Sequence, residues 1–147
     1  MGMLDNELIL SSNQAVSGTN TDVASSNFYN TGGANGQGDN GQTGENLWVT
    51  VRSLSAATGA GSTVQAVLQD SADGTTFADV TSGPATGVAN VTISATLLQV
   101  QPPPGMRQYW RIVYRITGTL TASSFDAYVS NTIQRNTARP SGIPKVL

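Results

Sequence analysis

Apolar and polar residues alternate along several short segments of the chain, most clearly between residues 107 and 117. Every second position there holds a large apolar side chain: Trp110, Ile112, Tyr114 and Ile116. Successive side chains of a strand point to opposite faces of a sheet, so these four would line one buried face. The other face would carry Arg107, Tyr109, Arg111, Val113 and Arg115. We therefore predict a strand with one face in a core and the other meeting solvent or another chain.

Further short segments have strand-like composition or alternation, and turn residues such as Asp73-Gly74 and Gly83-Pro84 separate them. The predicted strands cover residues 7–10, 27–30, 46–55, 63–71, 75–80, 88–101 and 123–133. No segment has a convincing helical pattern. Seven or eight strands joined by turns predict an all-β fold, a jelly-roll-like antiparallel β-sandwich with an extended N-terminal segment.

The chain of 147 residues suits one domain, which we place at residues 1–135. Residues 136–147 differ in composition, because they hold Arg139, Lys145 and two prolines but few apolar side chains. Such a segment cannot bury itself in a core. We predict an extended C-terminal arm, and the sequence leaves open whether this arm hangs free or orders against a partner.

Composition excludes several kinds of chemistry. The chain has no cysteine and no histidine, which rules out thiolate or imidazole nucleophiles, bases and metal ligands from its own residues. Charged residues make up 11% of the chain, against about 25% in an average soluble domain. With a net charge of −2, no field attracts nucleic acid or an anionic membrane. We expect no enzymatic activity, no catalytic or metal-binding residues, no cofactor, and no nucleic-acid or membrane partner.

Residues 32–45 form a glycine-rich stretch that includes Asn35 and Asp39. A phosphate-binding loop would end in Gly-Lys-Ser/Thr, and a calcium loop would carry several carboxylates at alternate positions. The stretch has neither pattern. It predicts a surface loop, of the length that is often either disordered or a functional contact.

Other residues allow both a structural and a functional interpretation. Asp70, Asp73 and Asp79 surround a predicted hairpin, where turn chemistry explains them without a catalytic pair or a calcium site. The arginines of residues 107–115 either bind anionic groups or pair with carboxylates of a neighbouring strand or subunit. Trp48 and Trp110 either stack on a sugar or base or belong to the core, which is the commoner role of strand tryptophans.

Four segments, in this order and spacing, carry a resemblance to a known family. They are residues 4–16 (LDNELILSSNQAV), 44–51 (GENLWVTV), 67–80 (VLQDSADGTTFADV) and 104–114 (PGMRQYWRIVY). The chain resembles the jelly-roll capsid cement, or decoration, proteins of tailed bacteriophages, of the kind first described on a Bordetella podophage. The likeness spans nearly the whole chain up to the C-terminal arm.

The resemblance implies a non-enzymatic homotrimer on the outer capsid surface of a virion, where it locks neighbouring subunits of the major capsid protein together. We expect contacts with the capsid or between subunits from the N-terminal segment, the glycine-rich loop, the central strand and the arm. The candidate residues are Leu4, Asn6, Asn35, Asp39, Arg107, Arg111, Arg115, Arg139 and Lys145.

Two rival functions remain open. One is a carbohydrate-binding jelly-roll module of a phage tail or fibre that uses Trp48, Trp110 or Tyr109 as a stacking platform. The other is a glycosidase that works through two carboxylates. Its candidate pairs come from Asp70, Asp73, Asp79 and Asp126.

Overall fold

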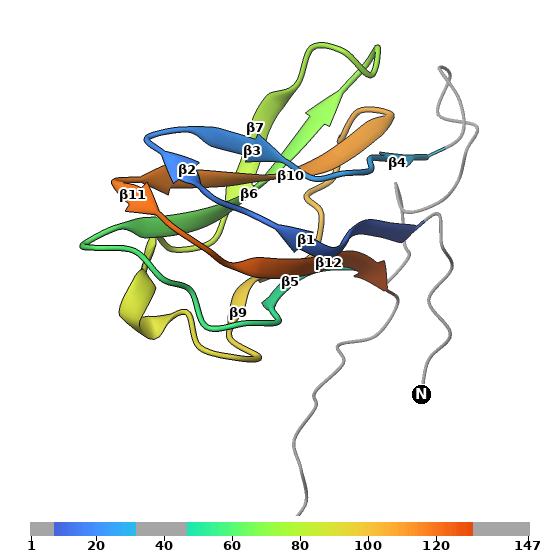
Figure 1. Cartoon of the computed structure of the whole chain (residues 1–147). Helices are drawn as coiled ribbons and strands as arrows, with labels where there is room; N and C mark the ends of the chain where they lie inside the picture. The colour runs from blue at the N-terminus through green and yellow to red at the C-terminus, as the bar shows by residue number, and fades with distance from the viewer. Residues whose placement is uncertain (1–7, 32–46, 131–147) are drawn as a thin grey trace, which may run out of the picture.

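The structure is a computed structural model that describes residues 8–31 and 47–130. Two antiparallel sheets pack face to face (Figure 1). The first, here the β5 sheet, has the order β1 (Ile9–Ala15), β12 (Ser124–Ser130), β5 (Trp48–Ser53), β9 (Thr96–Val100). The second, the β10 sheet, has the order β3 (Asp22–Ala24), β10 (Tyr109–Thr117), β6 (Thr63–Ser71), β7 (Ala78–Ser82).

Four shorter strands complete the described part of the chain. In the β10 sheet, β4 (Tyr29–Asn30) pairs with β10, and β8 (Thr86–Gly87) pairs with β6. The strands β2 (Gly18–Thr19) and β11 (Thr119–Leu120) form a separate two-stranded ribbon. A 3-10 turn, η2 (Val88–Asn90), precedes β9.

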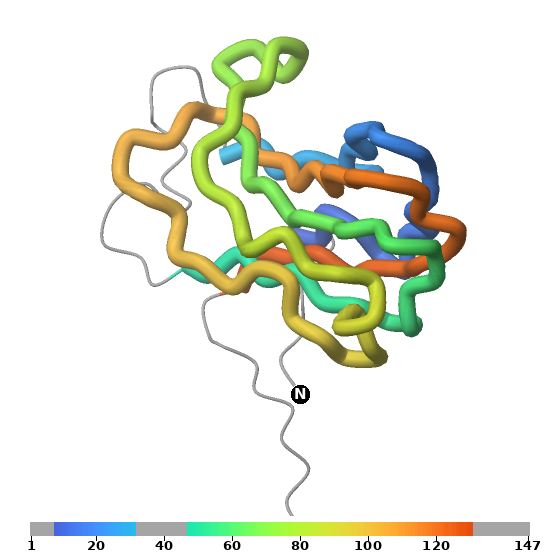
Figure 2. The backbone as a smooth tube through the Cα atoms, turned by 90° about the vertical axis from the view of Figure 1, so that its left-hand side faces the viewer, coloured from blue at the N-terminus to red at the C-terminus, as the bar shows by residue number. Residues whose placement is uncertain are grey.

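The strand order confirms the predicted jelly-roll sandwich. If β3 and β4 count as one position, β7 and β8 as another, and the β2–β11 ribbon is set aside, the described strands fill eight positions in chain order. The β5 sheet then holds positions one, eight, three and six, and the β10 sheet holds two, seven, four and five. Successive strands cross between the layers in this way in a jelly roll. Figure 2 shows the resulting crossings from the side.

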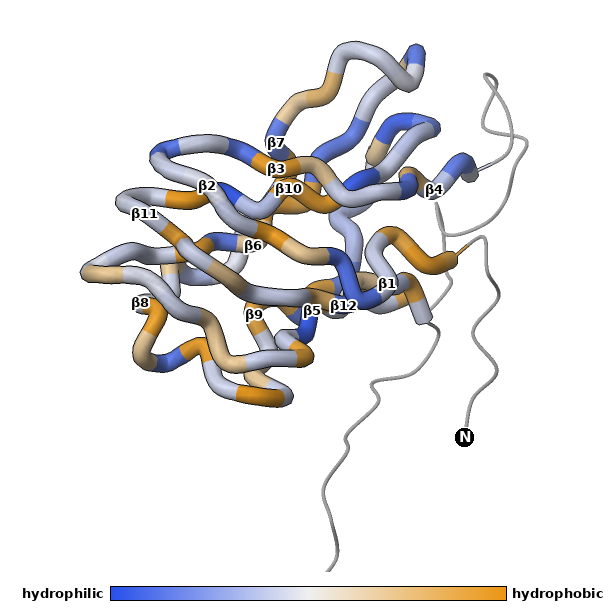
Figure 3. The backbone as a smooth tube through the Cα atoms, in the orientation of Figure 1, coloured by the Kyte–Doolittle hydropathy of each residue, from blue (hydrophilic) through white to orange (hydrophobic). Residues whose placement is uncertain are grey.

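One hydrophobic core lies between the two sheets. The predicted inner faces are confirmed: Trp110, Ile112 and Tyr114 of β10 are fully buried, as are Val64 and Leu68 of β6. From the other layer, Val49, Val51, Phe125, Ala127 and Val129 close the same core. Figure 3 shows the hydrophobic colouring recurring along the strands and giving way to polar colouring at the tip of the β6–β7 hairpin.

Tyr114 ties the two layers together. Its ring stacks on Phe125 of the facing sheet, with 4.9 Å between the ring centroids. Its hydroxyl donates a 2.9 Å hydrogen bond to Oγ of Ser11 in β1. Burial of the phenol raises the pKa of Tyr114, although its hydrogen bond to Ser11 acts in the opposite direction. The side chain therefore stays neutral and fixes the distance and register between β10 and β1.

The predicted long strand over residues 88–101 is wrong. Only Thr96–Val100 is a strand within this range, and Ile93, one of its alternating apolar residues, is 69% exposed. The preceding residues fold back on the end of β5, where the amide of Ser94 donates to the carbonyl of Ser53. Ser94 has a positive φ of 67°. The alternation of apolar residues in 88–101 therefore has two sources. A turn buries Val91, and β9 is a separate strand at the edge of the β5 sheet.

The first strand is longer than predicted within the described residues. The prediction ended the strand at residue 10, whereas β1 continues to Ala15 through two irregularities in its pairing with β12. The following Ser/Thr/Asn-rich passage also contains the short strands β2 and β3. These segments are edge strands with one solvated side, so their sequences lack the apolar runs that identify central strands.

At the opposite edge of the sandwich, the connection after β7 crosses close to β9. A Cβ atom built on Gly83 would lie 2.0 Å from the carbonyl oxygen of Leu97. The amide of Gly83 also donates to the carbonyl of Ala66 in β6. Glycine at this position lets the two sheet edges approach each other.

Candidate functional site

The outer face of the β10 sheet was one of the predicted contact regions. Arg111 and Arg115 lie on this face because they alternate with the buried residues of β10, and they stand opposite Gln69 and Gln65 of β6. Arg107 precedes the strand and lies beside the end of β6. The structure gives all three arginines partners within the chain.

Arg107 grips Asp70. Its Nε and Nη2 atoms donate to Oδ1 of Asp70 at 2.9 and 2.6 Å, and its backbone amide donates to Oδ2 at 2.8 Å. The carboxylate belongs to a residue that is only 7% exposed. Burial alone would raise the pKa of Asp70, but the hydrogen bonds and charge of Arg107 hold it below its ordinary 3.8. The pair fastens the start of β10 to the end of β6.

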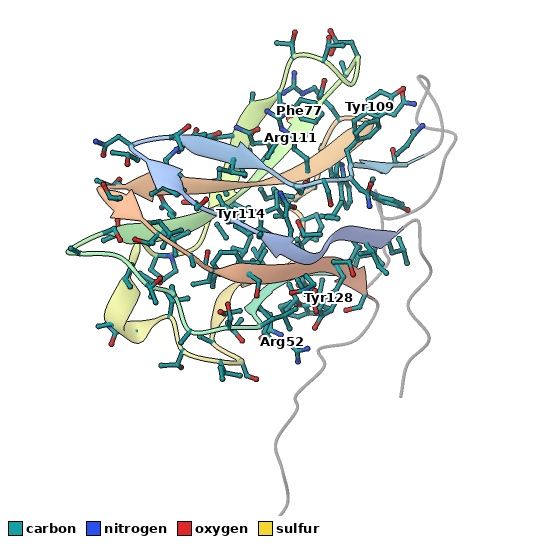
Figure 4. The ribbon with its side chains drawn as sticks, viewed as in Figure 1. Arg52, Phe77, Tyr109, Arg111, Tyr114 and Tyr128 are labelled. Atoms are coloured by element: carbon teal, nitrogen blue, oxygen red, sulfur yellow. The ribbon has the colours of Figure 1, made fainter. Side chains whose placement is uncertain are left out.

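Arg111 lies between a polar and an aromatic neighbour. Its Nε donates to Oε1 of Gln69 at 2.9 Å, and its guanidinium carbon lies 3.9 Å from the centroid of the Phe77 ring. Partial burial lowers the pKa of Arg111, yet an arginine remains charged at any physiological pH. Phe77, which shortly precedes β7, is a half-buried surface residue beneath this guanidinium. Figure 4 shows the two side chains together.

Arg115 pairs with carboxylates from two other strands. Its Nη2 lies 3.1 Å from Oδ2 of Asp22 in β3, and its Nη1 lies 3.1 Å from Oδ2 of Asp79 in β7. Hydrogen bonds from Gln69 and Arg115 lower the pKa of Asp79. Through Gln69, this network also reaches Arg111. The arrangement is the cross-strand pairing foreseen as one alternative, and it spans four strands of the β10 sheet.

The remaining carboxylates near the hairpin have a local role. Oδ1 of Asp73 accepts 2.8 Å hydrogen bonds from the amides of Thr75 and Thr76 and another from the hydroxyl of Ser71. These donors lower the pKa of Asp73. Gly74 follows with a positive φ of 76°, as expected for an Asp-Gly turn. Among the described residues, no group of three or more carboxylates could hold a metal ion.

Six of the predicted contact residues lie outside the described ranges 8–31 and 47–130. They are Leu4, Asn6, Asn35, Asp39, Arg139 and Lys145. Their contacts with a capsid or a second subunit stay predictions, as do those of Arg107, Arg111 and Arg115. For these three arginines, the structure adds a stabilising role inside the chain.

The aromatic residues proposed as a stacking platform are not brought together. Trp110 is completely buried and packs edge-on against Tyr29, so it belongs to the core. Tyr109 is half-buried beside Phe28, which is 52% exposed. Trp48 lies on the β5 sheet, the other layer of the sandwich. Of the three candidates, the structure therefore excludes Trp110 from contact with a sugar and places half-buried Trp48 and Tyr109 on different layers.

A groove between the sheets' edges shows no chemistry of its own. Its lining comes from the segment Ser82–Pro84 and from β9. None of these lining residues carries a charge.

The described residues include no helix with the length and hydropathy of a membrane span.

The outer face of the β5 sheet holds residues that the sequence interpretation passed over. Arg52 and Thr50 point away from the core, opposite Asp126 and Tyr128 of β12. Figure 4 shows Arg52 directed away from the sandwich, on the side opposite Arg111. Nε of Arg52 and Oγ1 of Thr50 are shielded from solvent and have no hydrogen-bond partner. The sequence does not show which strand lies beside β5, so no pattern marked Arg52 as unpaired.

Comparison with known proteins gives one family. The sequence profile of the Bbp16 family matches residues 10–129, which include nearly all of the described sandwich. No curated protein matches the chain.

Proposed function

The chain belongs to the Bbp16 family, and from this premise we propose that it is a non-enzymatic capsid cement protein of a tailed bacteriophage. In this proposal it binds the outer surface of the capsid as a homotrimer. There it stabilises contacts between neighbouring subunits of the major capsid protein. The resemblance of four sequence segments to cement proteins supports the proposal, and so does the jelly-roll strand order that this resemblance implies.

The observation that carries the proposal is the structural use of the carboxylates. Each aspartate of the described ranges accepts a hydrogen bond or forms an ion pair, and this contact either stabilises a turn or joins two strands. These residues are Asp22, Asp70, Asp73, Asp79 and Asp126. A glycosidase needs two carboxyl groups that face each other across a substrate. Because these carboxylates stabilise turns and strand contacts, we favour a binding protein over a glycosidase.

Multivalent binding would make such a surface effective. A trimer that touches several capsid subunits turns each later contact into an intramolecular one, so modest contacts add up to firm attachment. A ligand that binds only the assembled, expanded lattice stabilises that lattice by linkage. The expected result is a capsid that resists heat and internal pressure better.

Purified protein mixed with expanded shells of the same phage that lack it tests the proposal. We expect saturable binding in multiples of three copies and a higher melting temperature of the shell. Unexpanded precursor shells are the matched control and should bind less, because they do not present all docking surfaces at the correct spacing. Absence of saturable binding to expanded shells, with no rise in their melting temperature, would refute the proposal.

A further inference from the structure

Arg52 differs from the other arginines of the described ranges. Arg107, Arg111 and Arg115 all donate hydrogen bonds within the chain, whereas Arg52 forms no hydrogen bond or ion pair with any described residue. Its Nε is shielded from solvent without an acceptor. Two positions away, Thr50 is 3% exposed and its hydroxyl has no partner. Buried donors without partners cost free energy, so native structures rarely keep them.

The natural partner of Arg52 within the chain is engaged elsewhere. Asp126 stands directly opposite Arg52 on β12, and opposite charges in such positions normally attract each other. However, Oδ1 of Asp126 accepts a 2.7 Å hydrogen bond from the amide of Asn13 in β1. Asn13 lies where β1 slips in register and has a positive φ of 44°. This irregularity draws the carboxylate towards β1 and leaves Arg52 unpaired.

We infer that Arg52 binds, through its Nη atoms, a carboxylate from an aspartate or glutamate side chain of the capsid subunit to which the protein attaches. This inference rests on the proposed function and names the chemistry of one contact. A guanidinium offers a planar fork of donors that fits a carboxylate. Nε of Arg52 is shielded, so the two Nη atoms are the donors that an outside carboxylate can reach. Charge complementarity selects an acidic partner, because the unpaired group is a cation.

The neighbours of Arg52 suit a protein contact. Trp48, which is half-buried, lies on the same outer face because it precedes Arg52 by four positions in β5. Tryptophan, tyrosine and arginine are the residue types that dominate binding energy at protein interfaces. The protein's overall charge is −2, so long-range attraction does not draw acidic surfaces to it. Recognition of a carboxylate here is therefore local and depends on the guanidinium geometry.

Saturation binding to expanded shells tests the inference with three variants. Arg52→Gln removes the charge and the fork, and we expect at least about a tenfold loss of apparent affinity. Arg52→Lys keeps the charge without the planar fork and should restore little of the affinity. Thr121→Glu shifts the net charge by the same single unit at an exposed position after β11 and should bind as the unaltered protein does. The melting temperature of isolated Arg52→Gln should not fall.

Each other outcome has a definite meaning. If the unaltered protein binds shells and Arg52→Gln binds equally well, the inference is wrong while the proposed function stands. Full recovery by Arg52→Lys would overturn the geometric contact and leave only a general charge effect. A lower melting temperature of isolated Arg52→Gln would assign Arg52 a structural role instead. If the unaltered protein binds no shells, the proposed function and this inference fall together.

Discussion

The two sheets of the sandwich use their arginines in opposite ways. On the β10 sheet, Arg115 pairs with two carboxylates, Arg111 lies between a glutamine and an aromatic ring, and Arg107 closes on Asp70. On the β5 sheet, Arg52 has no described partner, although Asp126 stands opposite it. The difference shows that an exposed arginine is not by itself evidence of a binding site. What matters is whether neighbouring strands already satisfy its donors.

The largest effect should come from the most buried carboxylate of the arginine set. Asp70→Ala leaves several donors of Arg107 without their acceptor, and we expect the free energy of unfolding to fall by about 2 kcal/mol. On the other sheet, Asp126→Ala removes one bond to Asn13 and should cost less than about 1 kcal/mol. Urea unfolding of both variants measures the difference. Equal losses would mean that the two sheets are stabilised alike.

A smaller effect distinguishes two buried threonines. Thr31 is 1% exposed and donates to the carbonyl of Gln108 at 3.0 Å, whereas the 3% exposed Thr50 has an unpaired hydroxyl. Thr31→Val should lower the free energy of unfolding by about 1 kcal/mol, and Thr50→Val should leave it unchanged or raise it by up to about 1 kcal/mol. The same urea titration compares the pair. A clear loss in Thr50→Val would show that its hydroxyl is satisfied in the free protein.

The smallest effect is expected on mild acidification. The pKa values of Asp70, Asp73 and Asp79 lie below their ordinary 3.8 in the folded chain. Their contribution to stability is therefore complete above about pH 5 and is lost as the pH falls through 4 towards the folded values. Unfolding free energies at pH 6, 4 and 3 should decrease in that order, and less steeply in Asp70→Asn. A stability that does not change with pH would contradict the assigned contacts.

The sequence predicted the central strands well because burial on one face leaves a strong alternating pattern. Trp110, Ile112 and Tyr114, and likewise Phe125, Ala127 and Val129, are buried as their spacing indicated. Turn residues were equally informative, since Asp73 and Gly74 adopt the predicted turn. The alternation around Ile93 was misleading, because a turn on the end of β5 can bury every second residue for a few positions without forming a ladder.

The candidate site was less predictable, because partners distant in sequence decide which side chains are free. Arg115 and Arg52 both occupy outward-facing positions of predicted strands. The sequence did not show that Asp22 and Asp79 converge on Arg115. Nor did it show that Asn13 holds Asp126. Asp22 and Arg115, and likewise Asn13 and Asp126, are more than ninety residues apart in the sequence. Whether they meet depends on the register of their strands. For Asn13 and Asp126, a small irregularity in β1 decides it.

The close approach of Gly83 to Leu97 limits how this sandwich can vary. Even a methyl group at position 83 would overlap a main-chain oxygen of β9, and a main-chain atom cannot rotate away as a side chain can. Any larger residue would have to wedge the two layers apart along that margin. A substitution at the exposed groove residue Gln99 changes only the lining of the groove, whereas position 83 sets the spacing of the jelly roll's margin.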